Sequence, residues 1–325
     1  MRTHLTTPID ILPQPTVRPD SRLLLMGSCF TDAVGARMEQ GGLSVLRNPF
    51  GVLYNPLSIA DCLDYCLEQR TLDDTMLVQH DGLWHSWLHH TTLSHPDREA
   101  CRRQCNERID AAHQFLQVCD TIVVTWGTAY AYYLTTQPDN GQSLSEPLLV
   151  ANCHKVPARH FDRRRLSVEE IVQAWLPLCQ KLAQLPQQPR IIFTVSPIRH
   201  LADGAHGNQL SKATLLLTLD HLSDQWSVIS DQQNRVSQPA TDPQFSILNS
   251  QFSISYFPAY EIMMDELRDY RFYDRDMLHP SDLAVDIIWQ RFQQTYLLPE
   301  TIEHCLQGEK KYRQSQHRTI NNTTN

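Results

Sequence analysis

Residues that could perform nucleophilic chemistry stand near both ends of the sequence. In "LLLMGSCFTDAVG", an apolar run ends at Gly27 and Ser28 follows at once. Close to the other end, "YDRDMLHPSD" places Asp276 three residues before His279. A serine hydroxyl is a weak nucleophile until a neighbouring base takes its proton. The first question is therefore whether the fold brings these two segments together.

The spacing of Asp276 and His279 has two interpretations. In a turn, a carboxylate three residues before a histidine can accept the ring N–H. That contact fixes the tautomer and stabilises the imidazolium, which is the role of the acid in a Ser-His-Asp triad. Alternatively, Asp276 caps the helix that follows and His279 is a surface residue, with Pro280 suited to the first helical position.

Cys29 is a rival nucleophile in the first segment. A thiol at a helix N-terminus has a lowered pKa and ionises more readily. Ser28, however, directly follows the glycine that ends the strand. We therefore expect Ser28 to face the cleft and Cys29 to point away from it, into the packing between sheet and helix. A tight strand-to-helix turn without a catalytic role is the plain alternative.

Three further candidates follow predicted strands or turns. His154 and His200 could contact a substrate or serve as structural hydrogen-bonding groups. Arg199 could hold a carboxylate or phosphate of a substrate, or pair with an acidic side chain.

Two groups of potential metal ligands lack the usual spacing. The histidine-rich stretch contains His85, His89, His90 and His95, and the helical cysteine pairs are Cys62/Cys66 and Cys101/Cys105. Zinc sites use closer and more regular spacings, with a clear closing pair. We expect loop histidines near the cleft, free thiols, and neither a metal nor a cofactor.

Buried strands and amphipathic helices alternate along the chain. Strands are expected at 22–27, at the start of 43–56, and at 120–127, 190–197 and 253–258; helices are expected at 30–42, 57–70, 97–119, 167–185, 208–223 and 281–297. This alternation is typical of a three-layer α/β/α sandwich around a central parallel sheet. Ligands bind such sheets at the carboxyl ends of the strands, where the loops carrying Ser28, Gly127 and Ser196 would meet.

Two polar segments depart from this pattern. Residues 230–255 are glutamine-rich and contain "QFSILNS" followed by the similar "QFSISYF", so we expect a surface insertion. Residues 301–325 are polar, and we expect a disordered tail. Residues 20–300 are expected to form one domain.

The composition argues against several classes of function. The chain has 28 basic and 36 acidic residues, a net charge of −8, and no basic stripe, so nucleic acid is not an expected partner. We expect neither a secretory segment nor a membrane span. Nine scattered cysteines without a Cys-x-x-Cys pair are typical of free thiols in a reducing cytoplasm, so a cytoplasmic protein is expected.

Several unusual strings occur together and in order. They are "GSCFTDAVG", "NPFGVLYNPLSIA", "TWGTAYAY", "VANCHKVP", "SPIRH", "NQLSKA", "YFPAYEIMMDELRDYRFY" and "DMLHPSD". In these strings the chain resembles the GSCFA family, within the SGNH hydrolases or GDSL-like esterases, over nearly its full length. Thr31 stands where the family's name implies alanine, and residues 230–255 look longer than the family's usual connection.

The resemblance implies a flavodoxin-like SGNH fold and assigns roles to individual residues. Ser28 would be the nucleophile, His279 its general base and Asp276 the orienting acid. The candidates for the oxyanion hole are Gly51, Thr128 and Asn152. Esterases of this plan carry an asparagine in the block that here reads "TWGTA", and its absence leaves acyl transfer open beside hydrolysis.

The resulting hypothesis is a serine-dependent acyl ester hydrolase or O-acyltransferase. Its substrate would be a small-molecule or carbohydrate acyl ester. The alternative is a non-catalytic protein that binds a glycan or lipid-like ligand in the same cleft. The sequence predicts neither the acyl group and acceptor nor the oligomeric state.

Overall fold

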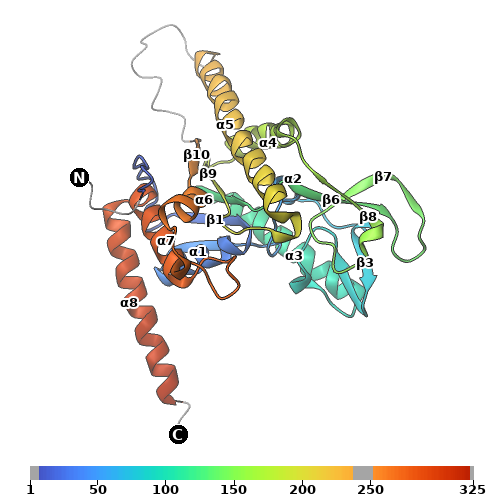
Figure 1. Cartoon of the computed structure of the whole chain (residues 1–325), viewed down its shortest axis with the longest axis horizontal. Coiled ribbons are helices and arrows are strands. Elements are labelled where there is room, and N and C mark those ends of the chain that lie inside the picture. The colour runs from blue at the N-terminus through green and yellow to red at the C-terminus, as the bar shows by residue number, and fades with distance from the viewer. Residues whose placement is uncertain (1–6, 237–251, 323–325) are drawn as a thin grey trace.

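A computed structural model describes residues 7–236 and 252–322, and within them five parallel strands form a central sheet in the order β10-β9-β5-β1-β2 (Figure 1). The strands are β1 (Arg22–Gly27), β2 (Ser44–Arg47), β5 (Thr121–Trp126), β9 (Arg190–Val195) and β10 (Ile254–Phe257). Counted along the chain, the spatial order is 2-1-3-4-5, which is that of flavodoxin-like sheets. The expected α/β fold with a central parallel sheet is confirmed.

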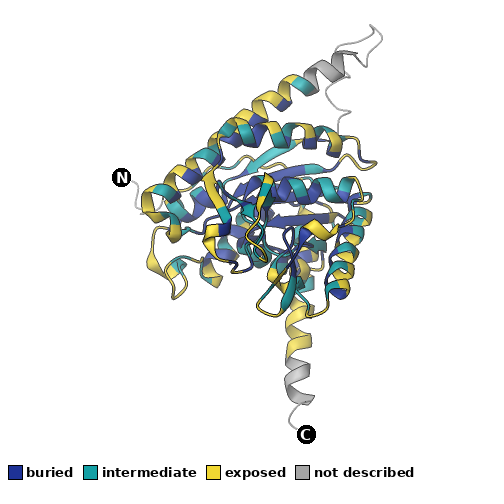
Figure 2. Ribbon diagram, turned by 90° about the vertical axis from the view of Figure 1, so that its right-hand side faces the viewer, coloured by how far each residue is buried: buried dark blue, intermediate teal, exposed yellow. Residues whose placement is uncertain are grey.

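Helices cover both faces of this sheet. They are α1 (Cys29–Gln40), α2 (Pro56–Leu67), α3 (Arg98–Leu116), α4 (Val168–Ala183), α5 (Gly204–Val236), α6 (Ala259–Glu261), α7 (Asp282–Tyr296) and α8 (Pro299–Asn322). Alternate side chains of β1 point to opposite faces. Leu24 belongs to the apolar cluster that contains side chains of α2, α3, α4 and α5, whereas Leu25 belongs to the cluster that contains side chains of α1 and α7. The sheet is therefore the buried middle layer, as Figure 2 shows.

Two antiparallel elements lie outside the central sheet and have no counterpart in the sequence prediction. β3 (Leu77–His80) pairs with β4 (Leu83–Ser86), and β6 (Tyr130–Thr136) pairs with both β7 (Ser143–Val150) and β8 (Phe161–Arg165). Figure 1 shows them at the end of the molecule opposite α7 and α8. Because β6 follows β5 closely, its sheet extends from the carboxyl edge of the central sheet.

Short connecting segments and caps fix the ends of these elements. The 3₁₀ and π segments are η1 (Asp74–Met76), η2 (Thr91–Leu93), η3 (Ala158–His160), η4 (Leu201–Asp203), η6 (Ile262–Glu266) and η7 (Tyr270–Phe272). Ser167 and Glu170 form a reciprocal capping box at the start of α4. Asn55 accepts the N–H of Ser58 at the start of α2. None of the helices in the described ranges combines the length and the apolar character needed to cross a membrane.

The polar tail is helical over most of its length. Residues up to Asn322 belong to α8, so the expected disorder of residues 301–325 is wrong there, and residues 323–325 lie outside the described part. Cys305 is fully buried, and Gly308 packs directly on Gly41 of the α1 C-terminus. Composition misses this helix because a few small and apolar side chains on one face suffice to dock it.

The segment 230–255 falls only partly within the described residues. α5 continues to Val236, well past the end predicted at residue 223, and β10 begins at Ile254. Residues 237–251 lie outside the described part of the chain. The surface insertion therefore stays a prediction.

Hydrogen bonds tie together the loops at the carboxyl edge of the sheet. Lys212 of α5 is 1% exposed, and its ammonium donates to the carbonyl oxygens of Gly127 at 2.6 Å and Ser196 at 2.7 Å. The carbonyl oxygen of Tyr54 accepts the N–H groups of Gly127 and Thr128. Because Gly127 follows β5 and Ser196 follows β9, Lys212 fixes the ends of two central strands relative to each other.

Gly27 ends β1 at a point where no side chain has room. Its φ is +146°, and an added Cβ would lie 2.2 Å from the carbonyl oxygen of Thr125. We expect Gly27→Ala to lower the free energy of unfolding by more than about 3 kcal/mol, because backbone strain and the clash add. Gly82→Ala is the matched control, since Gly82 also has a positive φ but no atom within 4 Å of an added Cβ; it should cost about 1 kcal/mol. Urea unfolding measures both, and equal losses would contradict the close approach of β1 to β5.

Lys212 should make stability depend on pH. Burial lowers its pKa to about 7 from the ordinary 10.5, so between these values the folded protein binds fewer protons than the unfolded chain and becomes more stable as pH rises. Relative to Lys212→Met, wild type should therefore gain up to about 1.4 kcal/mol of unfolding free energy per pH unit in this window. Chemical unfolding of both proteins measures the difference. A difference that stays constant with pH would contradict the lowered pKa of the buried lysine.

Candidate functional site

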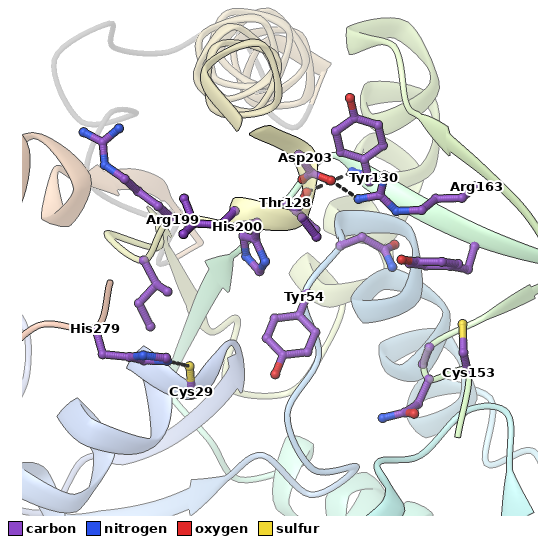
Figure 3. A pocket seen from close by; sticks show the side chains of 17 residues that line it. Cys29, Tyr54, Thr128, Tyr130, Cys153, Arg163, Arg199, His200, Asp203 and His279 are labelled. Atoms are coloured by element: carbon purple, nitrogen blue, oxygen red, sulfur yellow. Dashed lines mark hydrogen bonds and ion pairs between the residues drawn. The ribbon is translucent and has the colours of Figure 1, made fainter. Parts of the chain in front are cut away.

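A cavity of about 480 Å³ opens at the carboxyl edge of the central sheet. Cys29 follows β1, Thr128 follows β5 and His200 follows β9, and all three line the cavity together with Tyr54 (Figure 3). The loops after these strands therefore meet, as the alternation of elements predicts. Both the place and the volume are those of small-molecule sites in sheets of this topology.

Cys29, and not Ser28, faces this cavity. The Sγ atom of Cys29 lies 3.6 Å from Nε2 of His279, a contact drawn in Figure 3. Ser28 is 1% exposed, and its Oγ has no hydrogen-bond partner among the described residues. The expectation that Cys29 points away from the cleft is wrong.

The backbone explains this arrangement. Ser28 is the N-cap of α1 and still has extended dihedrals, with φ −71° and ψ 175°. Successive side chains of an extended chain point to opposite sides. The side chain of Ser28 therefore turns into the packing, and the first helical residue, Cys29, projects into the cavity. The structure brings His279 to the thiol and not to the hydroxyl.

Asp276 and His279 form one hydrogen-bonded turn. Nδ1 of His279 lies 2.5 Å from Oδ2 of Asp276, and Oδ1 accepts the backbone N–H groups of Leu278 and His279, both at 2.9 Å. These backbone N–H groups, together with the ring, lower the pKa of Asp276 to about 2. Ser281 caps α7 by accepting the N–H of Ala284. Asp276 thus orients the histidine and does not cap the helix.

The pairing sets the proton positions at the site. Because the carboxylate of Asp276 accepts the proton on Nδ1 of His279, Nε2 presents a lone pair toward Cys29. Burial raises the pKa of the Cys29 thiol. The N–H groups of Cys29 and Phe30 at the start of α1 act in the opposite direction, and the carboxylates of Asp32 and Asp276 add to the increase. The thiol therefore keeps its proton at neutral pH, with the lone pair of Nε2 of His279 directed at it.

The three oxyanion candidates differ in what they can donate. The N–H of Gly51 donates to the carbonyl oxygen of Asn48 at 2.8 Å, and that of Thr128 is directed to Tyr54 at 3.0 Å. Asn152 lines the cavity and accepts the N–H of His154 through Oδ1. Its amide nitrogen has no hydrogen bond to the described residues, so of the three it alone brings a free donor.

The three proposed substrate-contact residues differ in how they are placed relative to the cavity. His200 lines the cavity with its ring edge-on to Tyr54, and burial lowers its pKa to about 4, so it is neutral at pH 7. Nε2 of His154 donates to the carbonyl oxygen of Ser86 at 2.8 Å, and its ring stacks on His85 outside the cavity lining. The guanidinium of Arg199 is directed away from the centre of the cavity in Figure 3.

The metal alternatives find no support in the described ranges. Residues 7–236 and 252–322 contain no group of three or more histidine, cysteine or acidic side chains arranged to hold a metal ion. Cys62, Cys66, Cys101 and Cys105 are buried free thiols. His90 packs against Gly51 and donates its backbone N–H to the carbonyl oxygen of Phe50.

Among the cavity-lining residues that are absent from the sequence candidates, five carry aromatic or charged side chains. They are Tyr54, Tyr130, Tyr132, Arg163 and Asp203. A signal for three of them exists in the sequence: tyrosines alternate in "YAYY", and a basic run stands at 163–165. Tyr132 of β6 lies opposite Arg163 of β8, the cross-strand pairing that such alternation permits.

One of three comparisons with known proteins identifies a family. No curated protein matches the sequence. Among solved structures, the fold is similar to a carbohydrate esterase family 3 from Talaromyces cellulolyticus, with 8% sequence identity and a TM-score of 0.34 over 88% of this chain and 99% of that chain. The model of the GSCFA family matches residues 22–292. The chain therefore belongs to the GSCFA family.

Proposed function

We propose that this protein is a thiol-dependent acyl ester hydrolase or O-acyltransferase. In this proposal Cys29 is the nucleophile, His279 the general base and Asp276 the orienting acid. The observation that carries it is the chain of contacts from Sγ through the imidazole to the carboxylate, at the end of a cavity. A nucleophile, a base within reach and a third group that orients the base are the parts that covalent acyl transfer needs.

The reaction would run in two steps. Nε2 of His279 takes the proton of the Cys29 thiol while Sγ attacks the acyl carbonyl carbon and forms an S–C bond. As the tetrahedral intermediate collapses, the C–O bond to the alcohol breaks, and Nε2–H protonates the leaving oxygen. Water or an acceptor hydroxyl then gives a proton to Nε2 and attacks the thioester, which frees the acyl product and restores the thiol.

The oxyanion would be stabilised by groups at the same end of the cavity. The first N–H groups of α1 have no partner within the helix, and the helix dipole favours negative charge there. Asn152 can add its free amide nitrogen. Donors aimed at the developing charge contribute much of the rate in acyl transfer. Asn152 would then replace the asparagine that is missing after Gly127.

Two other candidates remain open to test. A serine enzyme would use Ser28, but this requires a rearrangement that brings its buried Oγ to the base. A non-catalytic protein would bind a ligand in the cavity without turnover.

Cys29 should be required and Ser28 dispensable. We expect Cys29→Ala to lower kcat on 4-nitrophenyl acetate by at least about 10³-fold, because removal of a triad nucleophile leaves only binding and oxyanion stabilisation. Ser28→Ala should stay close to wild type, since its Oγ makes no hydrogen bond within the described part of the chain. Cys153→Ala, which removes the other thiol lining the cavity, is the matched control.

Opposite results would identify the alternatives. Loss of turnover in Ser28→Ala with retention in Cys29→Ala would identify a serine enzyme. Absence of turnover from the wild-type protein across a panel of acyl esters would identify a binding protein.

Replacement of Asp276 should cost less than replacement of His279. His279 moves the proton, so His279→Ala should lose nearly all Cys29-dependent turnover. Asp276→Asn keeps the size of the side chain but loses its charge, and a triad acid by itself contributes less than the base or nucleophile. Asp274→Asn in the same loop is the control. Steady-state kinetics with circular dichroism checks the order, and wild-type activity of His279→Ala would contradict the triad.

A further inference from the structure

The cavity has a second polar end, formed by Tyr130, Tyr132, Arg163 and Asp203 and here called the ring subsite. We propose that the ring subsite binds the neutral, hydroxyl-rich alcohol portion of the acyl ester, that is, a sugar ring. The statement that the bound sugar is the alcohol portion of a substrate rests on the proposed function. The statement that the ring subsite binds a neutral sugar does not.

The position of the ring subsite fits this role. In Figure 3 its residues Tyr130, Arg163 and Asp203 lie across the cavity from Cys29 and His279. Tyr54 and His200 lie between the two ends. All of these side chains line the same cavity of about 480 Å³. An ester whose carbonyl carbon lies at Cys29 can extend its alcohol portion along the cavity into the ring subsite.

The charges of the ring subsite compensate each other. The guanidinium of Arg163 forms an ion pair with Asp203, whose side chain is only 1% exposed. A carboxylate or phosphate on the ligand would approach the carboxylate of Asp203, and an ammonium group would approach Arg163. Like charges in a cavity of low dielectric repel strongly. The pair therefore selects against both kinds of ion and in favour of a neutral ligand.

The same pair offers hydrogen bonds to hydroxyl groups. Oδ2 of Asp203 is buried and has no partner among the described residues, while Oδ1 accepts from Arg163. A buried carboxylate oxygen without a donor is unfavourable. A ligand hydroxyl inserted beside the guanidinium can donate to Oδ2 and accept from an N–H of Arg163. Two adjacent hydroxyls of a sugar present this combination of donor and acceptor.

The tyrosines add a rigid apolar surface. The guanidinium carbon of Arg163 lies 4.1 Å from the ring centroid of Tyr130 and 5.3 Å from that of Tyr132. Stacking holds the guanidinium in a fixed plane, and aromatic rings provide area on which the C–H face of a sugar can pack. An alkyl chain could use the aromatic surface but would leave Asp203 without a donor. A sugar ring uses both features.

The test measures binding to a protein that cannot turn over substrate. Cys29→Ala protein is titrated by saturation-transfer NMR with a panel of methyl hexopyranosides and methyl pentopyranosides. Glucuronate, glucosamine and cyclohexylmethanol serve as the anionic, cationic and apolar comparisons. In the same background, Arg163→Met/Asp203→Leu removes both charges together and preserves volume, which avoids an unpaired buried charge. Arg164→Met is the matched control, because Arg164 is the next residue of β8 and stacks on Tyr133 instead.

We expect saturable binding of at least one neutral glycoside. It should be at least about tenfold tighter than binding of the three comparisons, and at least about tenfold weaker in the double variant, with no change in Arg164→Met. The proposal is overturned if no neutral glycoside saturates, if glucuronate, glucosamine or cyclohexylmethanol binds as well, or if the folded double variant binds like its parent. Because no turnover is involved, these outcomes are independent of whether Cys29 is the nucleophile.

Discussion

The direct passage from β1 to α1 is the constraint on which the site depends. Gly27 lies so close to Thr125 that only glycine fits, and its peptide leads into Ser28 at the N-cap without an intervening loop. One residue is therefore extended and the next is helical, and their side chains separate to opposite sides. This geometry turns Cys29 toward His279 and leaves Ser28 in the packing.

The other parts of the site are held relative to this turn. Lys212 links the ends of β5 and β9. The carbonyl oxygen of Tyr54 accepts the backbone N–H groups of Gly127 and Thr128, which follow β5. A buried lysine lowers stability at neutral pH because burial disfavours its charge. The hydrogen bonds of Lys212 to two strand ends keep the cavity wall in place. The hydrogen bond to Asp276 holds the ring of His279 in place.

The sequence predicts the central sheet well and its additions poorly. The short, β-branched apolar runs of β5 and β9 favour buried strands, and their alternation with amphipathic helices predicts a parallel sheet. β6 and β8 are harder to recognise, because Tyr130 and Arg163 alternate with neighbours of mixed character and become a cavity wall only through pairing between distant segments. α8 is missed for a related reason, since its docking depends on the fit of Gly308 on Gly41, which composition does not reveal.

The sequence predicts which loops form the site, but not which side chain of the first loop faces the cavity. The spacing of Asp276 and His279 left two interpretations open, and the structure shows the hydrogen-bonded pair. The choice between Ser28 and Cys29 depends on the dihedral angles of one residue, which a linear pattern does not contain.

The most direct measurement of the central claim is the chemistry of the trapped acyl group. The protein is mixed briefly with an activated acyl ester, quenched in acid and mapped by peptide mass spectrometry, with and without neutral hydroxylamine. The account predicts an acyl group on Cys29 that hydroxylamine removes, as expected for a thioester. An acyl group on Ser28 that resists neutral hydroxylamine, as an oxygen ester does, would contradict it.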